Sequence, residues 1–239
     1  MKTARWAGAG LEPVRLDQVY RGAAEGKPVA VERIYLARHG QSESNRERRL
    51  CGQQDPALSE VGLRQSRQLA RVLADVPLAA VFSSTLRRTV QTAAPTAAAH
   101  GVTVTALPGL AELSLGMLEG RFRDERDPEA QALWQQRKAD PARFRPPGGE
   151  TFDELAARAL AALDQVLGSA PAGAALIVGH RETNRALLKG LLGWSTERVL
   201  KEKLRNHFVY EIDVAARTVL RTVSLREEDA GAAYDGFRT

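Results

Sequence analysis

Short apolar runs alternate with segments of helical period along most of this chain, and this alternation constrains the fold more than any other feature. Four runs are typical of strands: Val31–Arg38, Leu78–Ser83, Val102–Ala106 and Ala174–Val178. Between them lie residues spaced by three and four, the helical period, as from Leu63 to Leu73. Parallel strands need crossover connections of this kind. We therefore expect an α/β fold, a three-layer α/β/α sandwich with a mainly parallel sheet and helices on both faces.

The same patterns place the remaining elements. Ser59 opens one expected helix, and four others cover Thr85–Ala99, Gln131–Lys138, Thr151–Leu167 and Glu182–Leu192. Two alternating runs, Phe208–Val214 and Val219–Leu225, predict a hairpin. Residues 1–30 mix glycine, proline and charge around one short helix at Leu16–Gly22. We expect them to form an N-terminal extension, followed by a single domain over residues 31–239.

Charge and composition narrow the range of partners. Lys and Arg together number 34 against 29 Asp and Glu, and the cations form no block of five like charges. This balance suits an anionic small molecule better than nucleic acid. The sequence contains neither a secretory signal nor an apolar run long enough to cross a bilayer, and its single cysteine excludes an internal disulfide. We expect a cytoplasmic protein without membrane partners, and a homodimer is compatible with the sequence.

Polar side chains follow the first two expected strands, at the strand ends where parallel sheets bind ligands. Arg38 and His39 leave the first strand together, and Gly40 permits a tight turn, so the pair suits a phosphate. Taken alone, His39 is equally compatible with an ordinary loop histidine. Arg88 lies in the first turn of the next helix, near free amides that favour anions, with Ser83 or Ser84 as the helix cap. Taken alone, that arginine is more simply a solvated surface group.

The other two strands are also followed by titratable groups. Glu112 comes after the third strand and a short turn, where it is a candidate acid, although a lone carboxylate is usually a surface group. His180 follows the most apolar strand, and a helix begins directly after it. A titratable group at such a place rarely serves packing, so His180 is the strongest single candidate.

Taken in order, these segments resemble the histidine phosphatase superfamily, which includes the cofactor-dependent phosphoglycerate mutases. Arg38-His39-Gly40 is similar to the family's Arg-His-Gly triplet, and the segment from Ser84 to Arg88 to its Ser-x-Leu-x-Arg pattern. Three further motifs also match: the general-acid segment at Glu112, Gly116, Glu119 and Gly120, the Pro-Gly-Gly-Glu turn at 147–151, and the second histidine motif at His180 and Arg185. Five motifs in order over about residues 31–225 make the resemblance specific.

The resemblance implies a phosphoglycerate mutase-like fold and a phosphohistidine mechanism. His39 would be the nucleophile and Glu112 the general acid. Four residues would hold the phosphoryl group: Arg38, Asn45, Arg88 and His180. Four more are expected at the phosphate or substrate site: Ser42, Cys51 as a small loop residue and not a nucleophile, Gly52 and Arg181. Neither a metal nor another cofactor is expected.

Two features favour hydrolysis over transfer to a second hydroxyl. The interval between Glu112 and His180 is short, as in the phosphatase branch, and Leu115 stands where the mutases carry a tyrosine. The resemblance therefore implies a metal-independent phosphatase acting on a small phosphorylated molecule. Mutase-type transfer, or an inactive relative that binds phosphorylated ligands, are the alternatives.

The substrate should be chosen at the rim of the site. Arg181 stands where the family usually has glycine after the second histidine. We expect Arg181, Arg121, Arg123 and the proline-rich loop at Gly116–Gly149 to select the substrate, because long polar loops over a site are commonly specificity lids.

Overall fold

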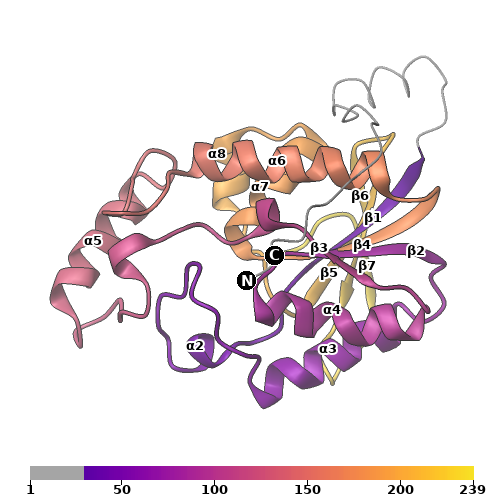
Figure 1. Ribbon diagram of the computed structural model, residues 1–239, viewed down its shortest axis with the longest axis horizontal. Helices are drawn as coiled ribbons and strands as arrows, with labels where there is room; N and C mark the ends of the chain where they lie inside the picture. Colours follow the sequence, from indigo (N-terminus) through magenta and orange to yellow (C-terminus); the bar gives the residue numbers. More distant parts are fainter. Residues whose placement is uncertain (1–29) are drawn as a thin grey trace, which may run out of the picture.

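In a computed structural model that describes residues 30–239, three layers stack as an α/β/α sandwich (Figure 1). The strands are β1 (Val31–Arg38), β2 (Leu78–Ser83), β3 (Val104–Ala106), β4 (Gly173–Gly179), β5 (Phe208–Asp213), β6 (Thr218–Ser224) and β7 (Ala233–Asp235). The α-helices are α2 (Glu43–Arg46), α3 (Glu60–Val72), α4 (Arg87–Ala99), α5 (Pro128–Ala139), α6 (Phe152–Ser169), α7 (Arg181–Leu192) and α8 (Thr196–Lys201). Two 3-10 turns, η1 (Pro108–Leu110) and η2 (Gly116–Leu118), follow β3. The expected helix at 16–22 lies outside the described residues, as does the expected extension apart from residue 30.

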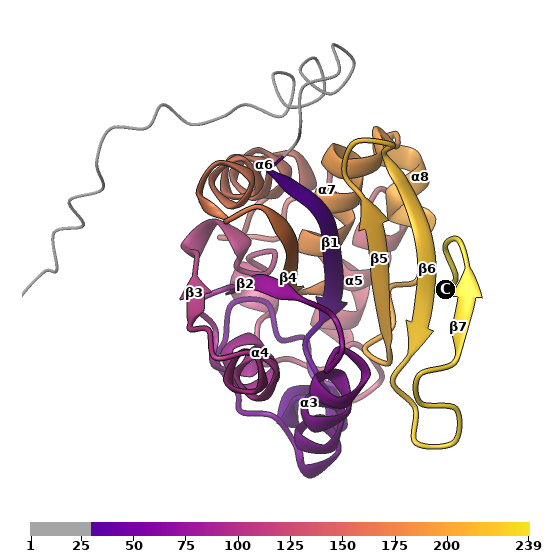
Figure 2. The same ribbon diagram turned by 90° about the vertical axis from the view of Figure 1, so that its right-hand side faces the viewer.

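The strands form one sheet in the order β3-β2-β4-β1-β5-β6-β7 (Figure 2). β3, β2, β4 and β1 run parallel to one another. The predicted hairpin is β5–β6, and its pairing with β1 on one side and β7 on the other is antiparallel. The sheet is therefore mixed: β3, β2, β4 and β1 form its parallel part, and the predicted hairpin extends it with antiparallel strands.

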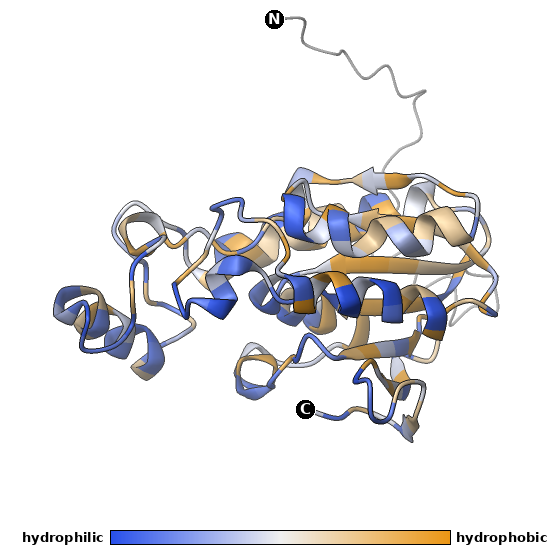
Figure 3. Cartoon of the chain, turned by 90° about the horizontal axis from the view of Figure 1, so that it is seen from below, coloured by the Kyte–Doolittle hydropathy of each residue, from blue (hydrophilic) through white to orange (hydrophobic). Residues whose placement is uncertain are grey.

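Helices cover both faces of the sheet, as expected. Along β1, Ile34 and Leu36 pack in the cluster that includes α6, α7 and α8, while Tyr35 and Ala37 pack with α3 and α4. This alternation is the period of two of a strand buried on both faces. Figure 3 shows apolar residues concentrated in the strands between the helices. Among the described residues, no helix is both long enough and apolar enough to span a membrane.

Local capping fixes most helix starts. Ser59 accepts a hydrogen bond from the Gly62 N–H and begins α3, and Thr151 forms a capping box with Glu154 at the start of α6. The prediction that Ser83 or Ser84 caps α4 is wrong, because the N-cap position is Leu86 and no side chain caps it.

The register of the three neighbouring strands β2, β4 and β1 brings their carboxyl ends to one edge. Arg38 is paired with Gly179, and Ser83 with Val178. The residues that follow these strands therefore meet. The backbone N–H of His39 donates to the Gly179 carbonyl at 3.0 Å, which places the first histidine beside the second.

Candidate active site

A cavity of about 300 Å³ lies at this edge of the sheet. Eight of the predicted site residues line it: Arg38, His39, Asn45, Cys51, Gly52, Arg88, Glu112 and Arg181. Ser42 and His180 are not on its wall. A second, larger hollow of about 630 Å³ lies between α3 and residues 225–228, and none of the predicted site residues lines it. The sequence-predicted residues thus gather at one place, next to the strand ends.

His39 is buried and electrically neutral. Its Nδ1 lies 2.7 Å from the Gly40 carbonyl oxygen, which can only accept a hydrogen bond. The proton of the neutral ring is therefore on Nδ1, and Nε2 keeps its lone pair. Burial, and then the charges of Arg88 and Arg38, hold the pKa of His39 well below its usual range. A neutral imidazole with a free Nε2 is a nucleophile at neutral pH.

The ring of His180 lies next to the ring of His39. The two ring centroids are 5.1 Å apart in an edge-to-face arrangement, and the His180 Nε2 is 2.8 Å from the Ser84 hydroxyl. Burial and the charge of Arg88 lower the pKa of His180 well below its usual range, so this ring is also neutral. Its Nδ1 is buried and has no hydrogen-bond partner within residues 30–239. Sequence reasoning found His180 but assigned Ser84 only to a helix cap.

Arg88 and Arg38 are held by backbone carbonyls. Arg88 donates from Nη1 to the Gln54 carbonyl at 2.6 Å and from Nη2 to the Gly52 carbonyl at 2.8 Å. Arg38 donates from Nη1 to the Leu204 carbonyl at 3.2 Å, and burial lowers its pKa to about 10, which leaves it charged at neutral pH. The Nε of each is buried without an acceptor in the described part of the chain. Unsatisfied buried polar atoms are rare, and here the Nε–H donor of each guanidinium and the Nδ1 atom of His180 all lack a partner among the described residues. The two guanidinium donors suit an anion.

Glu112 is fixed at the N-terminus of α7. Its carboxylate accepts hydrogen bonds from the backbone N–H groups of Arg181 at 3.1 Å and Glu182 at 3.2 Å, and from its neighbour Leu113 at 3.0 Å. The free amides at a helix start favour an anion there. The sequence-predicted acid is therefore held on the cavity wall by the N-terminus of the helix that follows His180.

Ser42 and Asn45 shape the loop after β1. The Ser42 hydroxyl accepts from the Asn45 N–H, and the Asn45 side-chain oxygen accepts from the Ser42 N–H, so the two form the capping box of α2. Ser42 is fully buried in this role, and only Asn45 reaches the cavity. Gly52 acts on the site through its carbonyl, which holds Arg88.

Cys51 lines the cavity as a thiol. Its Sγ donates to the Gln54 carbonyl at 3.6 Å, and burial raises its pKa. Because a thiol rather than a thiolate is present at neutral pH, this residue lacks the character of a nucleophile.

Three cavity residues that sequence reasoning did not single out are Arg48, Trp134 and Arg137, and Glu182, expected at the pocket rim as the start of a helix, also lines the cavity. Glu182 is a buried carboxylate in ion pairs with three arginines, at 2.8 Å to Arg181, 2.9 Å to Arg185 and 3.3 Å to Arg137. A usable signal was the spacing of three between Trp134 and Arg137, which puts both on one face of the expected helix.

Of the expected substrate-selecting arginines, Arg181 and Arg123 line the cavity and Arg121 does not. Arg121 is instead paired with Asp127 at 2.6 Å and Glu129 at 2.8 Å. Within residues 30–239, no three His, Cys, Asp or Glu side chains gather as they would around a metal ion.

Comparison with known proteins gives a consistent result. Residues 34–224 match the family model described as histidine phosphatase superfamily, branch 1. The chain is 38% identical over 181 residues to a probable phosphoglycerate mutase, GpmB, of Yersinia pestis strain Pestoides F, covering 75% of this chain and 84% of the relative.

Solved structures are similar as well. YhfR of Bacillus stearothermophilus is 28% identical, with a TM-score of 0.71 over 78% of this chain and 93% of that one. A mycobacterial glucosyl-3-phosphoglycerate phosphatase is 26% identical, with a TM-score of 0.66 over 75% and 89%. An alpha-ribazole phosphatase from Shigella flexneri, 24% identical with a TM-score of 0.70 over 87% and 100%, shares the fold.

Proposed function

Because the chain belongs to branch 1 of the histidine phosphatase superfamily, we propose that it is a metal-independent phosphatase that hydrolyses a small-molecule phosphate monoester through a phosphohistidine on His39. One observation carries the proposal. Within residues 30–239, a buried, neutral histidine with a free Nε2 shares the cavity with the unpartnered Nε–H donors of Arg38 and Arg88 and lies next to His180, whose Nδ1 also lacks a partner. A phosphoryl group would supply the acceptors that these donors lack.

In the first step, His39 Nε2 attacks phosphorus and the bond from phosphorus to the ester oxygen breaks. Glu112 acts as the general acid and gives a proton to the departing oxygen. The Nδ1–H bond to the Gly40 carbonyl stabilises the positive charge that develops on the ring. The guanidiniums of Arg38 and Arg88 stabilise the charge on the transferring phosphoryl oxygens.

In the second step, a water oxygen attacks the phosphohistidine. Glu112 takes one proton from that water, the phosphorus–nitrogen bond breaks, and its electron pair returns to Nε2 of His39. Inorganic phosphate leaves, and both residues have regained their starting forms. For His180, the Ser84 hydroxyl at Nε2 would keep the proton on Nδ1, ready to donate to a phosphoryl oxygen.

The test of the nucleophile is His39→Ala, with His207→Ala as the control because His207 lies at the other hollow, away from the cavity. Phosphate release from a panel of small monoesters should fall by about a thousandfold or more in His39→Ala. A radiolabelled substrate should leave an acid-labile, alkali-stable label on the wild-type protein and none on the variant. Full activity or unchanged labelling in a folded His39→Ala protein would overturn the proposal.

Mutase-type transfer is the second candidate, favoured by the identity of 38% to a probable phosphoglycerate mutase. The short interval between Glu112 and His180, and Leu115 near the acid, support water as the acceptor instead. Product analysis separates the two. Inorganic phosphate is expected as the main product, whereas an isomerised phosphate ester would favour the mutase. Tight ligand binding without turnover would favour an inactive binding protein.

A further inference from the structure

The cavity carries more positive charge than one phosphoryl group needs. Seven arginines line it: Arg38, Arg48, Arg49, Arg88, Arg123, Arg137 and Arg181. The carboxylates on its wall are Glu112 and Glu182. Two of the arginines hold the reacting phosphoryl group in the proposed mechanism, and Arg49 pairs with Glu47 at 2.8 Å. The remaining four, Arg48, Arg123, Arg137 and Arg181, we call the outer arginine cluster.

Glu182 does not neutralise this cluster. Its single carboxylate, 3% exposed as a residue, is shared by Arg137, Arg181 and Arg185. One negative charge among three guanidiniums leaves a positive excess in a poorly solvated place, where charges interact strongly. Arg137 itself is 5% exposed, and its Nη2, though close to Glu182, makes no hydrogen bond within residues 30–239. At the buried end of the cluster, one guanidinium nitrogen therefore has an ion-pair partner but no hydrogen bond.

Arg123, at the outer end of the cluster, also lacks an anionic partner among the described residues. Across residues 30–239 it forms no ion pair within 4.0 Å, and its guanidinium lies 5.8 Å from the centre of the Trp134 ring. Partial burial of the guanidinium of this otherwise exposed residue, and then the nearby charges of Arg181 and Arg48, lower its pKa, with only Asp124 opposing them. Cations that repel one another this way are stabilised by an anion that binds between them.

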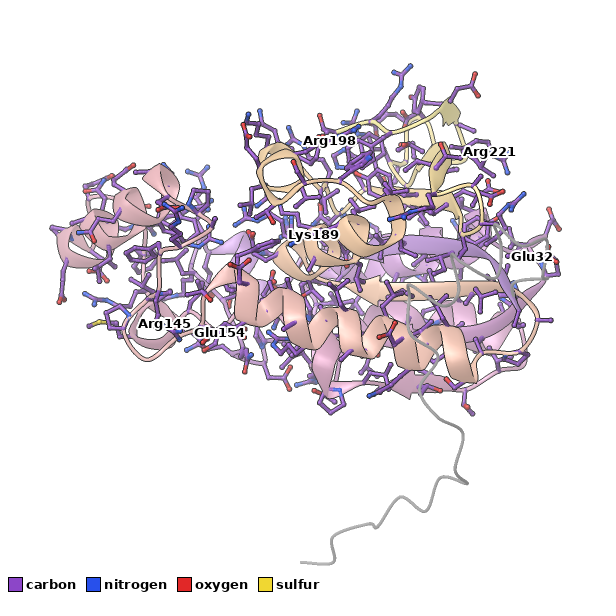
Figure 4. All side chains as sticks on the ribbon, turned by 90° about the horizontal axis from the view of Figure 1, so that it is seen from above. Glu32, Arg145, Glu154, Lys189, Arg198 and Arg221 are labelled. Carbon is purple, nitrogen blue, oxygen red and sulfur yellow. The ribbon has the colours of Figure 1, made fainter. Side chains whose placement is uncertain are left out.

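The segments that carry the outer arginine cluster are packed and hydrogen-bonded to the rest of the protein. Trp134 is 5% exposed and packs in the main core cluster, which fixes α5 beside the cavity. Residues 116–149 carry α5. Near the C-terminal end of this segment, Arg145 forms an ion pair with Glu154 on α6, and both residues are labelled in Figure 4. Near its N-terminal end, backbone bonds join Leu50 to Gly120 and Arg121. The arrangement is therefore preorganised for a ligand.

We propose that the outer arginine cluster binds a second anionic group of the substrate, a carboxylate or a second phosphate. The substrate is then a phosphate monoester with another acidic group, and its organic part lies against Trp134. This inference rests on the proposed phosphatase function. It divides the cavity into a reacting site at His39 and a recognition site formed by Arg48, Arg123, Arg137 and Arg181.

The experiment compares matched esters that differ in the second anion. Glycerol 3-phosphate, 3-phosphoglycerate and glycerol 1,3-bisphosphate share a three-carbon frame, and phenyl phosphate with 4-carboxyphenyl phosphate form a longer, rigid pair. We expect kcat/KM to be at least about tenfold higher for an anion-bearing member of either set, since charge-assisted hydrogen bonds are the strong ones. The ester with the higher kcat/KM identifies the second anion as a carboxylate or a phosphate. Equal kcat/KM throughout both sets would overturn the inference.

Arg123→Gln tests the cluster with little risk to folding, because Arg123 is exposed. Arg143→Gln removes the same charge from the same segment but lies away from the cavity wall, and is the matched control. The ratio of kcat/KM for the anionic ester to kcat/KM for its uncharged partner should fall about tenfold in Arg123→Gln and should persist in Arg143→Gln. An equal preference in both variants would count against the proposed site.

Measuring ester binding in the absence of turnover tests this inference separately from the phosphatase proposal. Calorimetry of the same esters on His39→Ala protein, with and without Arg123→Gln, measures the recognition site without turnover. If no ester is hydrolysed by the wild type, yet the anionic ester binds and loses about tenfold in affinity with Arg123→Gln, the phosphatase proposal fails and the anion site stands. If esters are hydrolysed but bind equally with and without the second anion, the anion site fails alone.

Discussion

At the scale of single residues, the hydroxyl of Ser84 links the second histidine to the strand ends. It lies 2.8 Å from His180 Nε2 and 2.7 Å from the Thr89 hydroxyl, and it accepts from the Leu86 N–H at 3.1 Å. All of these groups except Leu86 are buried. Ser84 therefore positions His180, whose ring lies in an edge-to-face arrangement with the ring of His39.

Ser84→Ala should lower kcat by about tenfold or more while the protein stays folded. The substitution leaves the buried Nε2 of His180 without its partner, at a cost of about 1–3 kcal/mol. The ring can then change tautomer or turn. Steady-state kinetics should show the loss in kcat rather than in KM, because the phosphoryl contact matters most in the transition state.

The adjacent Ser83→Ala removes the same hydroxyl from a residue that bonds the Ser84 carbonyl and not His180. It should keep most of the activity. If both variants had the same kcat as the wild type, Ser84 would have no positioning role.

Residues at strand ends could be predicted from the sequence, and contacts across the fold could not. His39, His180 and Glu112 each follow an apolar run, so their place at one sheet edge is implied by parallel topology. The pairing of Ser84 with His180 depends on the register of β2 against β4, which no local pattern specifies. Trp134 reaches the cavity only because of how the 116–149 segment packs.

At the scale of elements, two glycines let α3 touch the loop that carries His39. A methyl group at Gly62 would come within 2.1 Å of the Gln41 carbonyl oxygen, and one at Gly40 within 2.7 Å of the Gly62 carbonyl oxygen. The helix start therefore packs backbone to backbone against the residues after His39. This close approach, rather than backbone flexibility, requires glycine at both positions.

Gly62→Ala should both destabilise the protein and reduce its activity. The added methyl group must push away a backbone carbonyl, and overpacking of this kind costs about 1–3 kcal/mol in the free energy of unfolding. Because the displaced loop carries His39, kcat for any monoester should fall as well. Denaturant unfolding and steady-state kinetics measure the two effects. The control is Val61→Ala, one residue away and 38% exposed, which should change neither greatly. Wild-type kcat in a folded Gly62→Ala protein would show that the loop does not depend on this contact.

Long periodic elements were predictable, and short ones were not. α6 spans 18 residues with a capping box at its start, and its pattern predicts it nearly to its ends. β7 has three residues and α2 has four, too few for either to show a period. Such elements exist because neighbours hold them: β7 through pairing with β6, and α2 through the capping box of Ser42.

At the scale of the whole molecule, the two buried histidines of the candidate site make the stability of the fold depend on pH. Two buried imidazoles lie near the buried Arg88 and the partly buried Arg38, and the fold lowers the pKa of both His39 and His180. In the unfolded chain each histidine would titrate near pH 6.5. Below that pH the unfolded state binds protons that the folded state does not, so stability must fall on acidification.

The free energy of unfolding should therefore decrease between pH 7 and pH 5.5, by up to about 1.4 kcal/mol per pH unit for each of the two histidines once the pH is below about 6.5. Carboxylates whose pKa the fold lowers, Glu182 among them, lose their contribution only at more acidic pH, because their unfolded values lie lower. Denaturant unfolding across this range measures the slope. His39→Gln and His180→Gln should each reduce it by about one proton, whereas His207→Gln should reduce it less because that ring is only half-buried. A wild-type stability that stays flat from pH 7 to pH 5.5 would contradict the neutral state of both rings, and with it the readiness of His39 to attack phosphorus without first losing a proton.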